Sequence, residues 1–250
     1  MHYRSILLSD IHLGTTGCSA GRLLEFLRNN DADTLYLVGD IIDGWRLKRR
    51  PYWPQEHNDL VQKILRKVRK GTRVIYVPGN HDELMDQFIG FEFGHVEIHE
   101  EFIHLTPQGK RFLVTHGDEF DGITSNWSWL AHLGDSAYEC SVWVSRQINR
   151  IRSLCGMNHW SLAGYLKQQV KQAVSFIGNY EQALVRECAR RHFDGIVCGH
   201  IHHAQIKQVG PILYMNDGDW VESCTALVEE FDGTLRLIQQ TDEEIILATH

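Results

Sequence analysis

Histidine, aspartate and asparagine side chains recur in five short motifs, each directly after a run of apolar residues. The motifs are SDIH (9–12), GD (39–40), GNHD (79–82), THGD (115–118) and GHIH (199–202). In open α/β sheets, active sites form beyond the carboxyl ends of the strands, where residues distant in sequence converge. The spacing therefore predicts one site that is assembled from five strand ends.

Together the motifs offer carboxylate, amide and imidazole donors, which suit divalent ions such as Mn²⁺, Fe²⁺, Zn²⁺ or Co²⁺. The candidate ligands are Asp10, His12, Asp40, Asn80, His116, His200 and His202. This set is too large for one zinc ion, and it suits two ions about 3.5–4 Å apart, the arrangement of two-metal phosphoester hydrolysis. In D-x-H and H-x-H we expect extended backbone, which would turn both flanking side chains to one side. Glycines 39, 79 and 199 would allow tight turns beside the ligands.

The elements that must position these motifs alternate in the first half of the chain. Apolar runs at 5–8, 34–38 and 73–77 predict strands, and amphipathic stretches at 22–27 and 59–70 predict helices, with Gly71 as a left-handed cap. We expect a βαβαβ unit, extended by antiparallel strands near 95–99, 102–106 and 110–115. Strand signals return at 195–198, 204–209, 211–216, 224–230 and 234–239, and they predict a second antiparallel sheet that faces the first.

Residues 122–192 have helical periodicity and many aromatic residues, which predicts an inserted helical subdomain. This segment carries a charge of +4 in a chain whose net charge is −7. The overall acidity argues against a general nucleic-acid-binding protein, which needs a basic surface. The six cysteines have no CxxC spacing, so neither disulfides nor cysteine zinc sites are expected. Since no signal peptide or membrane-length apolar run is found, we expect a cytoplasmic protein.

The motifs D-x-H, G-D-x-x-D, G-N-H-D, H-G-D and G-H-x-H, in this order, resemble those of the calcineurin-like metallophosphoesterase superfamily. The resemblance implies an α/β fold with two facing mixed β-sheets flanked by helices, as a four-layer α/β/β/α sandwich. It implies one domain over residues 1–250, with the helical cap inserted at about 122–192.

The resemblance also implies two divalent ions, for which we expect Mn²⁺, with Fe²⁺, Zn²⁺ or Co²⁺ as alternatives. Asp10, His12, Asp40 and His202 would hold one ion, and Asp40, Asn80, His116 and His200 the other, so Asp40 would bridge them. His81 would be the catalytic side chain, with Asp82 placed to orient it or to raise its pKa. We expect Asp43 and Asp118 to orient ligand histidines or a water.

Within this superfamily, the combination of a helical cap and the motif GDW at 218–220 resembles the pattern of the UDP-2,3-diacylglucosamine pyrophosphohydrolases. This resemblance implies cleavage of a lipid-linked nucleotide sugar to UMP and 2,3-diacylglucosamine 1-phosphate, and peripheral contact with the inner membrane. Lys167 and Lys171, one helical turn apart, could meet the phosphate or ribose, or could form an ordinary solvated face. One departure is His81, since better-known members have Arg there.

Two other functions fit the same residues. One is a phosphodiesterase for cyclic nucleotides, nucleic acid ends or glycerophosphodiesters, which would share the metals and not the lipid. The other is a non-catalytic metal-binding scaffold, although no expected ligand position is missing and His81 is present.

Overall fold

The computed structural model describes residues 1–123, 162–241 and 244–250. The chain divides into two compact units, residues 1–120 together with 183–250, and residues 121–182. The first unit contains both β-sheets and all five sequence motifs. The single domain predicted for 1–250 and the predicted cap boundaries at 122–192 stay predictions, because much of this segment lies outside the described residues.

The larger sheet has its strands in the order β13-β12-β11-β1-β2-β3-β5-β4. Its strands are β1 (His2–Leu8), β2 (Asp31–Val38), β3 (Arg73–Val77), β4 (Glu92–Phe93), β5 (Val96–Ile98), β11 (Thr225–Glu229), β12 (Leu235–Gln240) and β13 (Glu244–Thr249). β1, β2, β3 and β5 are parallel, and β11 pairs antiparallel with the other side of β1. The predicted βαβαβ unit is therefore confirmed.

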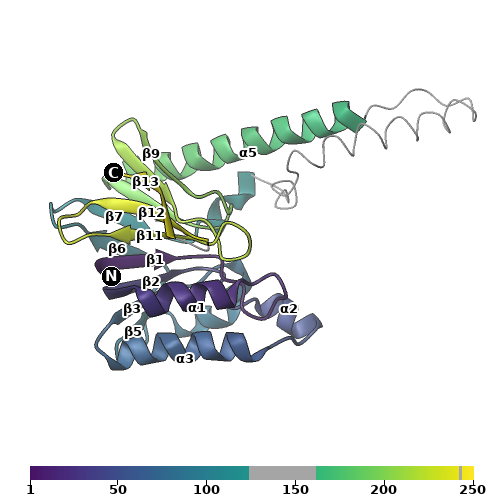
Figure 1. The fold of residues 1–250 in the computed structure, drawn as a ribbon. Helices are drawn as coiled ribbons and strands as arrows, with labels where there is room; N and C mark the ends of the chain where they lie inside the picture. Colours follow the sequence, from purple (N-terminus) through teal and green to yellow (C-terminus); the bar gives the residue numbers. More distant parts are fainter. Residues whose placement is uncertain (124–161, 242–243) are drawn as a thin grey trace, which may run out of the picture. The chain divides into compact units, whose positions relative to one another are not determined.

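Helices α1 (Ala20–Asn29) and α3 (Gln55–Arg69) cover one face of this sheet, as Figure 1 shows. Alternate residues of each strand face the helices or the second sheet. In β2, Leu35 and Leu37 pack in the helix-side core, and Tyr36 and Val38 in the core between the sheets. Burial on both faces explains why the parallel strands are nearly continuous apolar runs. Gly71 ends α3 with φ +101°, as predicted.

The second sheet is mixed and has the order β6-β7-β8-β10-β9. Its strands are β6 (Phe102–Leu105), β7 (Arg111–Val114), β8 (Gly195–Cys198), β9 (Gln205–Val209) and β10 (Ile212–Asn216). β7, β8 and β10 run parallel to one another, and β6 and β9 are antiparallel edge strands. The two mixed sheets with flanking helices confirm the predicted fold class.

The predicted strand direction and the predicted assignment of strands to sheets need correction in three places. β5 is parallel to β3 and not antiparallel. β6 and β7 belong to the second sheet, and β11 and β12 belong to the first. Short apolar runs that are buried on both sides do not reveal which neighbour they pair with. The second sheet is consequently mixed and not antiparallel.

Further helices are α2 (Gly44–Arg49), α5 (Leu162–Arg190), and the 3₁₀ helices η1 (Asn80–Phe88) and η2 (Asp118–Ile123). α5 falls within the predicted helical insertion, and its last residues, from Ala183, belong to the unit with the sheets. In the described part of the chain, helices are too short or too polar to span a bilayer.

Candidate metal centre

The site lies where six strands end. Asp10 follows β1, Asp40 follows β2, His116 follows β7, and the two remaining motifs follow β3 and β8; Asn216 and Asp217 lie at the end of the sixth strand, β10. Backbone hydrogen bonds continue past the strands, since Asp10 N donates to Gly39 O at 3.1 Å and Gly39 N to Val77 O at 2.7 Å. The loops that carry the ligands are therefore held at fixed mutual positions by main-chain bonds.

Most of the predicted ligands have a left-handed backbone. The φ angles are 48° at Asp10, 53° at His12 and Asp40, 69° at His200 and 52° at His202. The expected extended D-x-H and H-x-H segments are therefore wrong, because the chain turns sharply at each ligand. A left-handed backbone costs roughly 1–3 kcal/mol at each residue other than glycine, and such residues cluster at functional sites.

Two of the neighbouring glycines are needed for close approach and not for a turn. A Cβ on Gly79 would lie 2.5 Å from Asp40 Oδ1 and 2.7 Å from His116 Cδ2. A Cβ on Gly199 would overlap the Asp10 carboxylate. Gly39 has φ +75°, so it provides the expected turn, and a Cβ there would also overlap the His116 ring. Each glycine thus leaves room for a ligand side chain.

Asp40 lies between the two predicted ligand groups. Its Oδ1 is 3.5 Å from His116 Nε2, and its Oδ2 is 3.7 Å from His12 Nε2. The backbone N–H of His81 donates to Oδ1 at 2.9 Å, which fixes the carboxylate. Asp40 therefore has one oxygen toward each group, as a bridging ligand requires.

The remaining ligands gather on either side of Asp40. Asp10 Oδ1 is 3.1 Å from His202 Nε2 and 3.9 Å from His12 Nε2. Asp10 Oδ2 accepts a hydrogen bond from the backbone N–H of His200 at 2.8 Å. The rings of His116 and His200 are 5.1 Å apart. Atoms of Asp10, His12 and His202, and atoms of Asp10, Asp40 and His116, lie close enough together to share an ion.

The chemistry of these donors fits divalent ions. His116 Nδ1–H donates to Val38 O at 3.1 Å, which leaves Nε2 as the donor atom that faces Asp40. The buried Oδ1 of Asn80 has no hydrogen-bond partner among the described residues. A buried amide oxygen without a partner is costly, and a cation would satisfy it. The structure thus brings all seven predicted ligands to one edge of the sheets, and their role as ligands remains a proposal.

Charges within the cluster shift the pKa values of its members. Burial would lower the pKa of His116, but the carboxylates of Asp40 and Asp10 raise it to about 10. Burial would also lower the pKa of His202, but the carboxylate of Asp10 raises it to about 9. Burial would raise the pKa of Asp10, yet His202 and His116 hold it well below its usual range. Without a cation, protons on the histidines compensate the buried carboxylates.

His81 is oriented by Asp43 and covered by Trp45. Asp43 Oδ2 is 3.2 Å from His81 Nδ1 and 3.5 Å from His12 Nδ1, and Oδ1 caps α2 by accepting from Arg46 N at 2.7 Å. Trp45 lies with its ring centroid 4.4 Å from that of His81. Burial opposes protonation, but Asp43 and Asp40 raise the pKa of His81. Its Nε2 is 3.8 Å from Asp40 Oδ2, on the side of the metal ligands.

We expected Asp82 to orient His81, but its carboxylate forms other hydrogen bonds. Its two carboxylate oxygens accept hydrogen bonds from the backbone N–H groups of Ile41 at 2.9 Å and Ile42 at 2.7 Å. Burial raises its pKa to about 6. Asp82 therefore holds the loop after β2 in place, and Asp43 provides the carboxylate beside His81.

The other candidates are placed less fully. Asp118, on η2, contributes to the raised pKa of His116. Lys171 is exposed on α5, and the Lys167 side chain lies outside the described residues. Both lysines belong to the unit of residues 121–182, whereas the candidate metal ligands belong to the other unit, so their contact with substrate stays a prediction.

The five predicted motifs do not include the polar residues at the end of β10. Ser9 Oγ donates to Asp217 Oδ1 at 2.6 Å, and burial raises the pKa of Asp217 to about 8. Asn216 Nδ2 donates to Gly199 O at 2.7 Å, directly before the ligand His200. Asn216 and Asp217 therefore hold the two loops that carry the candidate ligands Asp10 and His200. The rule that located the other five motifs would have found this sixth strand end, ND at 216–217.

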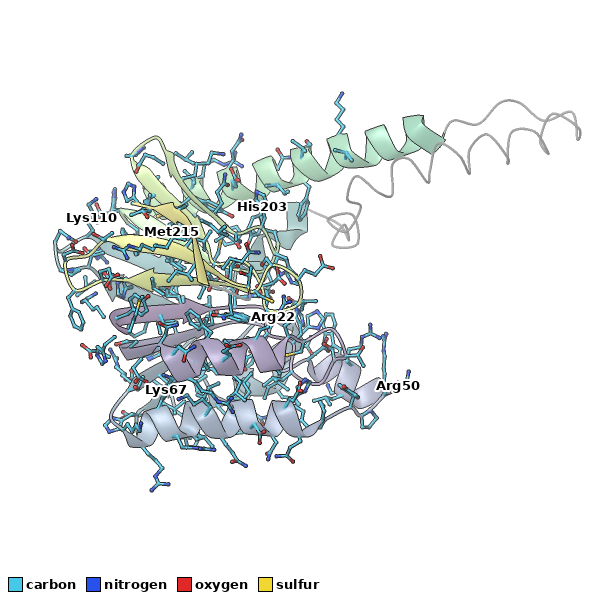
Figure 2. All side chains as sticks on the ribbon, viewed as in Figure 1. Arg22, Arg50, Lys67, Lys110, His203 and Met215 are labelled. Carbon is cyan, nitrogen blue, oxygen red and sulfur yellow. The ribbon has the colours of Figure 1, made fainter. Side chains whose placement is uncertain are left out.

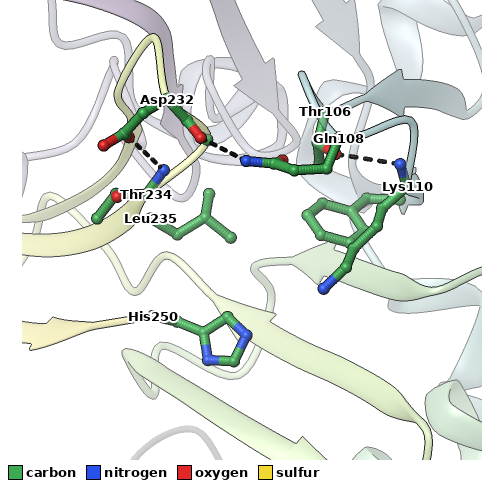
Figure 3. A pocket seen from close by; sticks show the side chains of 9 residues that line it. Thr106, Gln108, Lys110, Asp232, Thr234, Leu235 and His250 are labelled. Carbon is green, nitrogen blue, oxygen red and sulfur yellow. Dashed lines mark hydrogen bonds between the residues drawn. The ribbon is translucent and has the colours of Figure 1, made fainter.

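A separate cavity of about 310 Å³ lies among the β6–β7 turn, the β11–β12 turn and His250 (Figure 3). Several of its polar groups already form hydrogen bonds with one another. Thr234 N donates to Asp232 Oδ1 at 2.8 Å, and Lys110 N donates to Thr106 Oγ1 at 3.1 Å. No predicted site residue lines this cavity.

Comparisons with known proteins agree with this geometry. The family model for calcineurin-like phosphoesterases matches residues 3–204. The UDP-2,3-diacylglucosamine hydrolase of Actinobacillus succinogenes is 23% identical over 90% of this chain and 95% of its own length. That of Salmonella agona is 29% identical over 82% of this chain and 84% of its own length. Among solved structures, the phosphoesterase Yfce from E. coli aligns with a TM-score of 0.50 at 20% identity, over 98% of this chain and 97% of that one. The structural likeness concerns the fold alone.

Proposed function

The chain belongs to the calcineurin-like phosphoesterase family and is a metal-dependent phosphoesterase, and we propose that it hydrolyses UDP-2,3-diacylglucosamine at a two-metal centre. The products would be UMP and 2,3-diacylglucosamine 1-phosphate. The proposed substrate is supported by the similarity to the relatives that are named UDP-2,3-diacylglucosamine hydrolase. As parts of the same proposal, the ions are Mn²⁺, and the protein works in the cytoplasm in peripheral contact with the inner membrane.

One observation carries the two-metal proposal, namely the position of Asp40. Its two oxygens face His116 on one side and His12 on the other, at 3.5 and 3.7 Å. With Asp10, His12 and His202 on one side and Asn80, His116 and His200 on the other, each side offers enough donors for one ion. When bound, such ions lower the pKa of a water and neutralise phosphoryl oxygens.

The side chains around the ligands would carry the other steps. His81, with its raised pKa, would hold a proton at Nε2 and donate it to the leaving oxygen. Asp43 beside Nδ1 keeps the ring oriented, and Trp45 limits the access of water to one ring face. His can exchange a proton where Arg supplies charge only, so this chain can assist the leaving group by protonation.

The direct test is turnover. Protein loaded with Mn²⁺ should release UMP from UDP-2,3-diacylglucosamine dispersed in detergent, as followed by mass spectrometry. Hydrolysis in ¹⁸O-labelled water identifies the phosphorus that is attacked, because the label enters UMP or the lipid phosphate. A His81→Ala variant should lose about 10²–10⁴-fold in kcat with its metal content unchanged. Efficient cleavage of simple diesters without any UMP release would refute the lipid substrate, and an unaffected His81→Ala variant would favour a scaffold.

A further inference from the structure

Residues 45–53 form a basic and aromatic segment in a protein whose net charge is negative. The stretch GWRLKRRPYWP at 44–54 has four basic residues and no acidic one, whereas the chain has a net charge of −7. The side chains of Arg46, Lys48, Arg49 and Arg50 are all exposed. Trp45, Tyr52 and Trp53 are 41%, 40% and 43% exposed. Grouped exposure of large aromatic side chains marks an interaction surface.

This basic–aromatic segment borders the metal centre and is rigidly attached to it. Tyr52 and Trp53 pack edge-on against the buried ring of His57, with centroids 5.8 and 5.6 Å apart. His57 Nδ1 accepts a hydrogen bond from the backbone N–H of Gly14, in the loop that carries His12. At its other end, Trp45 contacts His81. Figure 2 shows Arg50 at the outer edge of the protein, beyond α2.

We propose that residues 45–53 dock the protein on an anionic phospholipid bilayer and so hold the metal centre against the headgroup layer. This inference rests on the proposed function, because a diacylated substrate resides in a bilayer. Lysine and arginine side chains are attracted to anionic headgroups. Tryptophan and tyrosine favour the membrane–water interface, where one part of the ring is apolar and another is hydrated.

The shape of the surface favours a bilayer over nucleic acid. A flat bilayer needs to contact only a projecting segment, whereas a nucleic acid needs a basic track along the protein. Leu84, on the neighbouring η1, is 56% exposed and adds aliphatic surface that headgroups and upper acyl chains can accept. η1 packs on α2, so Leu84 belongs to the same side.

The experiment is sedimentation of the full chain with vesicles of equal parts phosphatidylcholine and phosphatidylglycerol, and with vesicles of phosphatidylcholine alone. The test variant is Arg46→Gln/Arg49→Gln/Arg50→Gln. The control, Arg66→Gln/Arg69→Gln/Lys70→Gln on α3, removes the same charge from exposed residues elsewhere.

The unchanged protein and the control should bind the mixed vesicles and release them as salt rises. The test variant should partition about 100-fold more weakly, since each basic residue near an anionic surface contributes about fivefold. Equal binding to both kinds of vesicle, equal loss in both variants, or binding of single-stranded RNA without vesicle binding would overturn the proposal. Turnover in detergent needs no bilayer and should be the same in both variants, so vesicle binding and the proposed activity can fail independently.

Discussion

Replacement of Gly79 by alanine should displace the central ligand of the metal site. The new Cβ would lie 2.5 Å from Asp40 Oδ1, 2.6 Å from Asp40 N and 2.7 Å from His116 Cδ2. An ordinary C···O contact is about 3.3 Å or longer, so the carboxylate must move by about 0.8 Å. Metal sites tolerate about 0.2 Å. We expect metal affinity to fall by about tenfold or more, and the free energy of unfolding to fall by about 1–3 kcal/mol from overpacking.

The assay is the metal-to-protein ratio by elemental analysis after dialysis against a graded Mn²⁺ buffer, combined with urea unfolding. Gly21→Ala is the matched control, because Gly21 lies in α1 of the same unit and its nearest atom would be 3.9 Å from the new Cβ. Gly21→Ala should bind metal normally and be slightly more stable, as alanine favours helix. If Gly79→Ala bound Mn²⁺ as tightly as the unchanged protein, the inferred role of the close approach in placing Asp40 would be refuted.

Three further predictions concern the groups around the ligands. Asp43→Asn keeps the cap of α2 but loses the charge beside His81, so kcat should fall about tenfold, the loss of a charge-assisted contact worth roughly 1.5 kcal/mol. The alkaline limb of its pH–rate profile should also move to lower pH, because His81 would lose its proton more easily. The control Asp232→Asn, in the distant turn where Thr234 N donates to Asp232 Oδ1, should alter neither kcat nor this limb. Asp82→Ala should cost about 2–4 kcal/mol in urea unfolding, since two buried N–H groups lose their acceptors; an unchanged stability would contradict this role. For metal-free protein, the folded pKa of His116 near 10 lies above its unfolded value, so the stability it contributes is complete below about pH 6.5 and is lost as pH rises through 10, which thermal unfolding in EDTA should show.

The parallel part of the fold and the convergence of the ligands could be predicted from sequence. Apolar runs followed by Asp, Asn or His marked the strand ends. Because active sites form beyond the carboxyl ends of parallel strands, these polar residues were expected at one edge of the sheet. All seven predicted ligands lie there. Period and strand length, however, could not assign β6, β7, β11 and β12 to their sheets, because pairing depends on which edges are free after the first strands have packed.

The local geometry of the site was harder to predict. Five ligands in the left-handed region contradict the expected extended segments, because main-chain bonds between neighbouring loops decide the conformation there. The placement of Asp43, and not Asp82, beside His81 has a similar cause. Both aspartates follow a ligand closely in sequence, and only the fold shows which one meets a ring and which one meets backbone N–H groups.

The central position of β1 has a consequence for biosynthesis. β1 pairs with β2 on one side and with β11, more than two hundred residues later, on the other. A nascent chain that has emerged only through the loop after β7 carries Asp10, Asp40 and His116, but neither His200 nor His202. If these residues hold the proposed ions, coordination would be complete only after residue 202 has emerged from the ribosome, so metal loading would follow the synthesis of β8.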